Sequence, residues 1–281
     1  MFDNKSKKNL PDIPSSPEHI RFLQEVQHRK MSIRFTQILI LVAAFASWEI
    51  FAQLKIVDPF ITSQPSRILQ TIRTLYEGGV LWHHIWVTCT ETIIGFLLGT
   101  VLGVILAIAL WWSEFLSQVM EPYLVVLNSL PKIALGPVFI VWIGAGPAAI
   151  IVMTLAISLI VTILEVLNGF LATDKEKIKL VEIFGGNKFQ VLSLVLIPAS
   201  FPNIINALKV NVGLSWVGVI VGEFLVSKAG LGYLIVYGGQ VFKLDLVMTS
   251  VVILGVAAAL MYQGVVFLER MILRKNQSRS S

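Results

Sequence analysis

The sequence predicts an all-α polytopic membrane protein with about six transmembrane helices, and composition, hydropathy and the length of its apolar runs all indicate this class. Of the 281 residues, 56% are hydrophobic and only 14% are charged, and the mean hydropathy is +0.79. A soluble domain usually carries about 25% charged residues, so a soluble fold and a separate soluble catalytic domain are excluded. The apolar content also excludes a disordered chain.

Six apolar runs give the expected spans in chain order. They cover 35–52, about 88–112, about 122–143, roughly 148–171, 201–224 and 246–268. A span must satisfy its own backbone hydrogen bonds, and these long runs lack β alternation, so each is predicted to be a helix. The expected division is an N-terminal tail over 1–34, a transmembrane domain over 35–270 and a C-terminal tail over 271–281.

The distribution of lysine and arginine sets the expected orientation. Fifteen of these residues fall in the two tails and in the connection between the fourth and fifth spans, against five on the opposite side. Because positive charge favours the cytoplasmic side, both termini are expected to be cytoplasmic. The short loop expected near 113–121 disagrees, since it carries only acids. The polar first 34 residues lack the apolar core of a cleavable signal peptide.

Glycine and proline mark two spans as special. Gly95, Gly99 and Gly103 recur every four residues in the second span and so share one helix face. Another backbone can approach such a face closely, either within the same subunit or across a dimer. In the third span, Pro131 and Pro137 each remove a backbone donor and predict a kink. Kinked segments at membrane depth usually line a cavity.

Four ionisable residues lie within or near the ends of spans: Glu91, Lys132, Lys209 and Glu223. A charge at the bilayer centre costs about 2.5–3.5 kcal/mol on insertion scales, so such residues usually face protein or water. Lys132 is the best pathway candidate, because a cation there would favour an anionic substrate; alternatively it pairs with a carbonyl freed by the kink. Lys209 is expected to snorkel. Glu223 is either a solvated end residue or a contact for a neighbouring mobile segment or a partner protein.

Residues 174–198, between the fourth and fifth spans, form an amphipathic segment too short to span. Asp174 is expected to cap a helix ending at Phe184, and Gly185 and Gly186 are expected to turn the chain with positive φ. A second helix should follow and stop at Pro198. Its apolar side is expected to comprise Phe189, Leu192, Val195 and Leu196. The segment is a helix-turn-helix on the cytoplasmic surface, or else an ordinary interfacial linker.

This segment resembles the cytoplasmic coupling loop of binding-protein-dependent ABC transporter permeases. In that family the loop reads Glu-Ala-Ala, three residues, Gly, nine residues, then Ile-x-Leu-Pro. Gly185 and Pro198 keep the spacing of thirteen, and Lys179-Leu180-Val181 stands where the family has Glu-Ala-Ala. The resemblance implies that the ATPase-coupling residues are Lys179, Leu180, Val181, Glu182, Gly185, Gly186, Val195, Ile197 and Pro198.

Other stretches are similar to the nitrate/sulfonate/taurine/bicarbonate-type permeases. Residues 128–146 look like their third-span signature, 222–233 like their extracytoplasmic gate segment, and 59–66 like the opening after the first span. The resemblance covers roughly 55–270 and implies a type I ABC importer permease fold in a bacterial inner membrane. It assigns to the pathway or gate Pro131, Lys132, Pro137, Glu223, Gly230 and Gly232.

The resemblance also implies function and partners. The chain would form the translocation pathway of an ATP-driven importer for a small anion such as a sulfonate, taurine, nitrate or bicarbonate, or alternatively for a thiamine-precursor pyrimidine. Expected partners are two copies of an ATPase, an extracytoplasmic solute-binding protein and a second copy of this chain, a heterodimer being less usual. No Gly-x-x-x-x-Gly-Lys-Ser/Thr loop occurs, so the chain is not expected to be an enzyme or to bind a cofactor; ATP and Mg would be used by the partner.

Other classes fit less well. Cys89 is the only cysteine, so neither an intrachain disulfide nor a cysteine metal site is expected. His83 and His84 point about 100° apart on a helix and cannot easily share a metal ion. No basic stripe suggests nucleic acid, and no His-Glu-x-x-His or Gly-x-Ser-x-Gly motif suggests an intramembrane enzyme. An ion-coupled secondary transporter commonly has broken helices in both halves, whereas the breaks here are confined to the third span.

Overall fold

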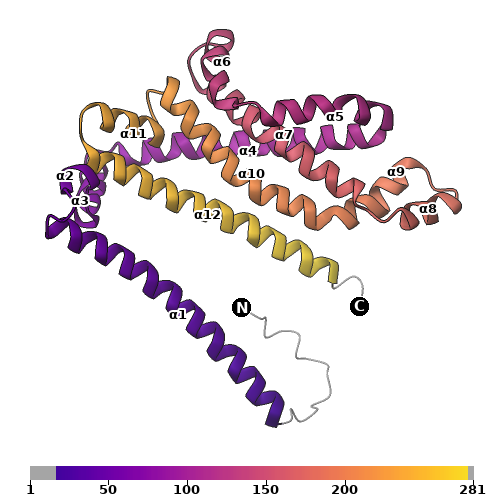
Figure 1. Ribbon diagram of the computed structural model, residues 1–281, viewed down its shortest axis with the longest axis horizontal. Helices are drawn as coiled ribbons and strands as arrows, with labels where there is room; N and C mark the ends of the chain where they lie inside the picture. The colour runs from indigo at the N-terminus through magenta and orange to yellow at the C-terminus, as the bar shows by residue number, and fades with distance from the viewer. Residues whose placement is uncertain (1–16, 278–281) are drawn as a thin grey trace. The chain divides into compact units, whose positions relative to one another are not determined.

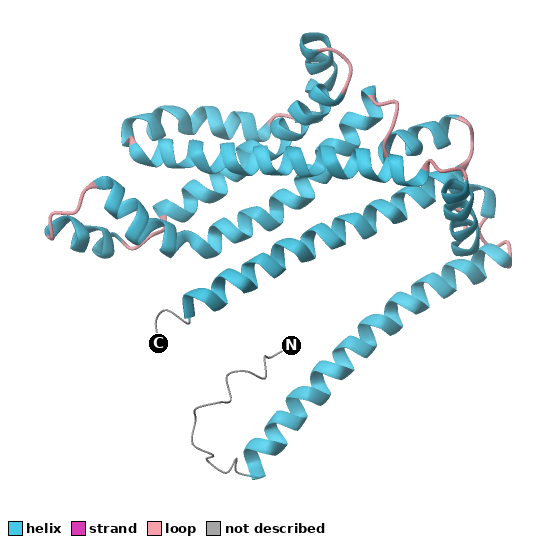
Figure 2. Ribbon diagram, turned by 180° about the vertical axis from the view of Figure 1, so that it is seen from behind, coloured by secondary structure: helices cyan, strands magenta, loops and turns pink. Residues whose placement is uncertain are grey.

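The computed structural model describes residues 17–277, and in this part of the chain helices joined by short connections form the whole structure, with no strand (Figure 2). The all-α fold class is therefore confirmed. Of the fifteen lysine and arginine residues that set the expected orientation, Lys5, Lys7, Lys8 and Arg279 lie outside the described residues.

The helices follow the chain in a simple order. They are α1 (Pro17–Gln53), α2 (Pro59–Thr62), α3 (Pro65–Glu77), α4 (Leu81–Trp112), α5 (Glu114–Ser129), η2 (Lys132–Leu135), α6 (Gly136–Ile143), α7 (Pro147–Leu171), α8 (Lys175–Ile183), α9 (Lys188–Val191), η3 (Leu192–Leu196), α10 (Ile197–Val226), α11 (Leu231–Gln240) and α12 (Leu244–Gln277). Here η2 is a 3₁₀-helix and η3 is a π-helix.

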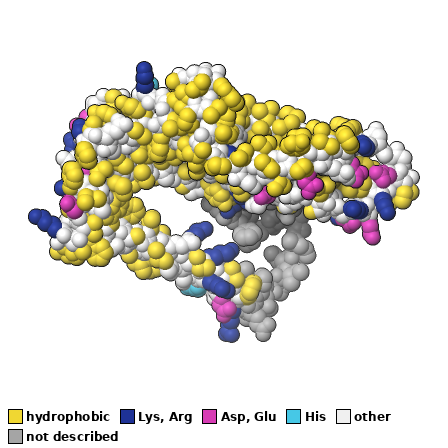
Figure 3. Space-filling model, turned by 45° about the horizontal axis from the view of Figure 1, so that its top comes forward, with side chains coloured by type: hydrophobic (Ala, Val, Ile, Leu, Met, Phe, Trp, Pro, Cys, Tyr) yellow, Lys and Arg dark blue, Asp and Glu magenta, His cyan; other side chains and the backbone are white. Residues whose placement is uncertain are grey.

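Five of the described helical stretches are long and apolar enough to cross a membrane. They are Gln24–Gln53, Leu81–Trp112, Pro147–Leu171, Lys188–Val226 and Leu244–Ile272. The α5 helix and the η2–α6 stretch pass the same test together, with an 87° bend between them, and would make a sixth span. Figure 3 shows hydrophobic side chains over most of the visible surface, as expected for helices that face lipid.

The chain divides into two units, of which the first runs to Ser66. Its main element, α1, begins at Pro17, well before the apolar run that starts at Phe35. The polar stretch between them contains no glycine and no further proline, so nothing in it ends the helix. Asp58 then caps the short α2 helix by accepting a hydrogen bond from the Phe60 amide at 2.9 Å.

The second unit, from Arg67 onward, is built around α7. Its most extensive contacts are with α10 and α4, and α11 packs on α12 (Figure 1). The glycine stripe of α4 lies against α7 of the same chain. A Cβ on Gly95, Gly99 or Gly103 would lie 2.6, 2.5 and 2.6 Å from the side chains of Thr154, Ser158 and Thr162, respectively. Glycine is required there because the two helices approach too closely for any side chain.

An ion pair connects α10 to α12. Lys209 Nζ lies 2.8 Å from Glu269 Oε2, and the two side chains are only 24% and 22% exposed. The ammonium of Lys209, which is expected to snorkel, thus has a carboxylate partner on α12. Its carboxylate partner, 60 residues later in the chain, offers a nearer compensation for the charge than water does.

The region expected as one kinked third span is two helices. Ser113 caps α5 by accepting a hydrogen bond from the Leu116 amide at 3.2 Å, so 113–121 is helix rather than loop. The helix α5 ends at Leu130, which has extended backbone angles (φ −65°, ψ 139°) because it precedes Pro131. Pro137 does not interrupt a helix, since it lies in the first turn of α6, where no backbone donor is needed.

Candidate functional site

The segment α8–α9 is closed by a tight glycine turn. Asp174 caps α8 by accepting a hydrogen bond from the Glu176 amide at 2.9 Å. At the other end, the amide of Gly185 donates to Glu182 O and that of Gly186 donates to Val181 O, both at 2.9 Å. This pair of bonds is the Schellman arrangement, which requires a left-handed residue after the helix. Gly185 is that residue, with φ of +80°.

Gly186 serves a different purpose from the one expected, because its φ is not positive. A Cβ on Gly186 would lie 2.7 Å from the carbonyl oxygen of Val181 and would also clash with the Val181 side chain. The close approach follows directly from the hydrogen bond that Gly186 donates to the same carbonyl. The two glycines are therefore needed for two reasons: one for backbone conformation and one for space.

The second helix does not stop at Pro198. Asn187 starts α9 with a capping box, in which the side chains of Asn187 and Gln190 each accept a hydrogen bond from the other's amide. The helix then continues through η3 into α10, so that Lys188–Val226 is one helical stretch. In the wider π turn the Ile197 amide bonds to Leu192 O. We attribute the tolerance of Pro198 to this turn, which displaces the carbonyl that a proline ring would otherwise meet.

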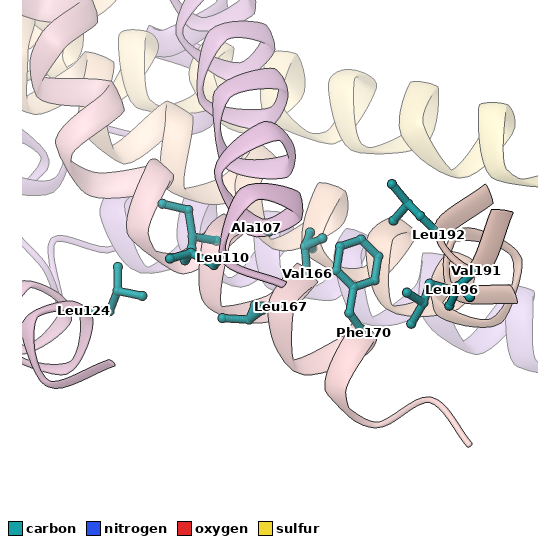
Figure 4. Close-up of a cluster of buried hydrophobic side chains, with 11 residues drawn as sticks. Ala107, Leu110, Leu124, Val166, Leu167, Phe170, Val191, Leu192 and Leu196 are labelled. Carbon is teal, nitrogen blue, oxygen red and sulfur yellow. The ribbon is translucent and has the colours of Figure 1, made fainter. Parts of the chain in front are cut away.

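A buried hydrophobic cluster fixes this segment to the spans (Figure 4). Val191, Leu192 and Leu196 pack with Val166, Leu167 and Phe170 of α7 and with Ala107 and Leu110 of α4. The expected apolar face is thus only partly right, because Phe189 is 65% exposed and Val191 is buried in its place. The Lys188 ammonium also donates to Trp112 O, at the end of α4, at 3.2 Å.

The outer side of the turn is an exposed apolar surface, which we call the turn groove. It is a groove of about 320 Å³ lined by Leu180, Val181, Phe184, Gly185, Gly186, Gln190 and Leu194. Phe184, which lines the groove, and the adjacent Ile183 are 83% and 80% exposed. Lys179 and Glu182 are exposed on the same short helix. Most of the expected coupling residues therefore come together here, whereas Val195, Ile197 and Pro198 lie on the helix that follows and do not line the groove.

Lys132 lies at the break between α5 and η2. Its ammonium donates to Asn128 O at 2.9 Å, which is one of the carbonyls left free at the end of α5. The stem of Lys132 lines a pocket of about 180 Å³ whose other lining residues are apolar. The expected local contact with a carbonyl is thus present, and the positive charge remains beside an apolar pocket.

Glu223, Gly230 and Gly232 meet at the opposite end of this unit, at the start of α11. Glu223 is 1% exposed, so the expectation of a solvated end residue is wrong. Its Oε2 accepts a hydrogen bond from the Gly232 amide at 2.6 Å, which places the carboxylate at the N-terminus of α11. A Cβ on Gly232 would lie 2.8 Å from that oxygen, and one on Gly230 would overlap the carboxylate. The glycines make room for Glu223.

Sequence reasoning missed two residues of α4 at this point. The Gly230 amide donates to His84 Nδ1 at 3.0 Å, and the Leu231 amide donates to Thr88 Oγ1 at 2.7 Å. His84, Thr88 and Glu91 are spaced as one face of a helix, and that polar stripe in an apolar run was the available signal. Among the described residues, no group of three His, Cys, Asp or Glu side chains is placed to hold a metal ion.

Comparison with known proteins gives one family for most of the chain. Residues 99–277 match the family described as binding-protein-dependent transport system inner membrane component. An aliphatic sulfonates transport permease protein of Bacillus subtilis is 27% identical over 241 residues, 86% of this chain and 87% of that protein. An ABC transporter permease protein of Haemophilus influenzae is 30% identical over 225 residues, or 80% and 91% of the two chains. A formylaminopyrimidine transport permease protein of Halalkalibacterium halodurans is 27% identical over 186 residues, or 66% and 74%.

Solved structures show the same fold. The amino acid ABC transporter crystallised with histidines has a chain that matches with a TM-score of 0.54 and 16% identity, over 74% of this chain and 96% of that one. A chain of the methionine ABC transporter in an inward-facing conformation matches with a TM-score of 0.52 and 20% identity, over 65% and 94%.

Proposed function

Because the chain belongs to the binding-protein-dependent transport system inner membrane components, we propose that it forms the solute pathway of an ATP-driven importer in a bacterial inner membrane, with both termini cytoplasmic. In this proposal two ATPase subunits supply the energy, a solute-binding protein delivers the solute, and two copies of this chain enclose the pathway. The chain itself hydrolyses no ATP.

The turn groove is the observation that carries the proposal. An exposed Phe184 and Ile183 on a short helix are an unusual surface for a segment rich in lysine and glutamate. Such a patch, rimmed by charge, is typical of a surface that binds another protein. Docking there would transmit motion, because the cluster around Phe170, Leu192 and Leu196 leaves the turn little freedom to move independently of α7 and α10.

A small organic anion is the substrate that we favour, with sulfonates first. The Bacillus relative is a sulfonate permease by its name. Lys132 is consistent with an anion, because its charge lies at a broken helix beside an apolar pocket. A thiamine-precursor pyrimidine is the second candidate, supported by the name of the Halalkalibacterium relative.

Uptake in cells tests the proposal. Cells that express this chain with its partner ATPase and binding protein should accumulate labelled ethanesulfonate, and deletion of the ATPase gene should abolish uptake. Competition by excess taurine but not by formylaminopyrimidine would support the sulfonate assignment, and the reverse would establish the second candidate. Uptake that persists without the ATPase would contradict the importer proposal.

A further inference from the structure

Two glutamates at the α11 end of the second unit, Glu91 of α4 and Glu223 of α10, form a buried carboxyl pair that no part of the proposed function uses. They are 6% and 1% exposed. Both lie at the start of α11, since Glu223 accepts the Gly232 amide and Glu91 is one turn from Thr88, which accepts the Leu231 amide. Their carboxyl groups interact with one another there. Glu91 Oε2 and Glu223 Oε1 are both fully buried and find no donor among the described residues. An unpaired buried carboxylate oxygen is expensive, and two such oxygens side by side call for a shared ligand.

A proton is the ligand that fits. Two buried carboxylates in contact repel one another, and a proton placed between them removes one charge while giving each orphan oxygen its partner. A metal ion would need more ligands than this site offers, since Mg²⁺ and Ca²⁺ take six or more oxygens. No group of three potential ligands lies close enough together in the described chain.

The surroundings decide which residue carries the proton. Glu223 accepts the Gly232 amide at 2.6 Å and lies at the N-terminus of α11, where the helix dipole favours a negative charge. The amide of Tyr233 is a further donor toward it. In the part of the chain that the structure describes, no backbone amide donates to Glu91. Glu223 is therefore the carboxylate and Glu91 is the acid that donates to it.

The other ionisable groups near the pair do not replace this proton. They are His83, His84 and Cys89 on α4, Tyr233 on α11, and Lys228 in the turn between α10 and α11. His84 is already engaged as an acceptor from the Gly230 amide. Lys228 is exposed at the rim of a pocket of about 430 Å³ that Glu91 also lines. The face of α7 at this pocket is lined by Pro147 and Ile150, which do not ionise.

We propose that Glu91 and Glu223 hold one proton between them, and that this bridge fastens α4 and α10 to the start of α11. Figure 1 shows α11 at the same end of the unit as the first turns of α4, and these two helices are in contact. The 430 Å³ pocket beside Glu91 gives water a route to the pair. Loss of the proton leaves two buried negative charges, which repel and release the α10–α11 turn. The site is thus a proton-dependent latch on the segment that contains Gly230 and Gly232.

Infrared spectroscopy of the purified full-length chain tests this without any transport assay, so its outcome is independent of the importer proposal. At neutral pH the wild-type protein should show the C=O stretch of a protonated carboxylic acid. The band should be lost in Glu91→Gln and unchanged in the matched control Glu121→Gln, whose carboxylate is exposed. If the wild-type protein lacks the band, or Glu91→Gln retains it, the proposal is wrong.

Thermal unfolding gives a second readout. The folded protein holds a proton that an exposed glutamate of the unfolded chain has already released at neutral pH, so stability should fall as pH rises. Glu91→Gln keeps a donor toward Glu223 at every pH and should flatten that dependence. If Glu91→Gln fails to fold, the carboxylic-acid band of the wild-type protein must still disappear on raising the pH. A pH dependence that is the same in both proteins, or stability that responds to added Na⁺ or Ca²⁺ instead of pH, would overturn the proposal.

Discussion

Replacing Gly185 should weaken binding of the ATPase in proportion to the strain that each side chain introduces. Gly185 has φ of +80°, and a Cβ placed there meets no atom within 4 Å. The penalty is therefore conformational alone. An L-residue in the left-handed region is disfavoured by about 1–2 kcal/mol. Alanine should be near the lower limit, which corresponds to about fivefold weaker binding.

Valine should be at or beyond the upper limit, because a β-branched residue at positive φ is an outlier. That corresponds to roughly thirtyfold weaker binding. Asparagine, which tolerates this region, should stay close to wild type. The series Asn, Ala, Val at one position thus predicts a rank order as well as a magnitude.

Titration of the purified ATPase onto the chain in nanodiscs measures these affinities directly. Gly264→Val is the matched control, because Gly264 is an exposed helical glycine of α12 that likewise has no atom within 4 Å of an added Cβ. It should bind the ATPase as wild type does. Wild-type affinity in Gly185→Val would show that the turn conformation plays no part in docking.

Three other predictions follow from the spans. Lys132→Met should lower uptake at least several-fold without loss of folded protein, while Lys132→Arg keeps the charge and most of the activity. If the two variants take up solute at the same rate, the charge of the lysine plays no part in transport. Lys209→Met should lower the free energy of unfolding, and with it the melting temperature. The loss should lie between the ~1 kcal/mol of a surface ion pair and the ~4 kcal/mol of a buried one, and adding Glu269→Gln should recover part of it. Cysteines at Ser6 and Ser280 should react with an impermeant maleimide only after cells are permeabilised; labelling of intact cells would refute cytoplasmic termini.

Features that depend on interactions between residues close together in the chain could be predicted from the sequence. Asp174 and Gly185 act through hydrogen bonds and backbone angles within a few residues of themselves, so the helix start and the turn could be predicted in place. Five of the six expected spans follow from apolar length alone, and the expected third span is the bent pair of α5 with η2–α6. The first helix was underestimated because Phe35 marks where hydropathy begins, whereas the helix itself begins at Pro17.

What the sequence could not show is which residues meet across the fold. Pro198 is a strong local stop signal, yet the helix continues through a π turn whose residues Leu192 and Leu196 are held in the buried cluster. Glu223 lies at the end of an apolar helix, where solvent is the natural guess. It is buried instead, with its carboxylate at the Gly232 amide and beside Glu91, a residue far away in the chain. Both the continuation of the helix at Pro198 and the burial of Glu223 depend on packing between elements that are distant in the chain, which a local sequence pattern does not show.

Uptake by the reconstituted complex tests the central claim most directly. Proteoliposomes that contain this chain and its ATPase, supplied with the binding protein and a labelled sulfonate on the outside, should accumulate the solute only when ATP and Mg²⁺ are sealed inside. Proton and sodium ionophores should leave that uptake unchanged, and Gly185→Val should reduce it together with the ATP hydrolysis that the solute-loaded binding protein stimulates. Accumulation without ATP, or accumulation that ionophores abolish, would contradict the account and indicate an ion-coupled transporter.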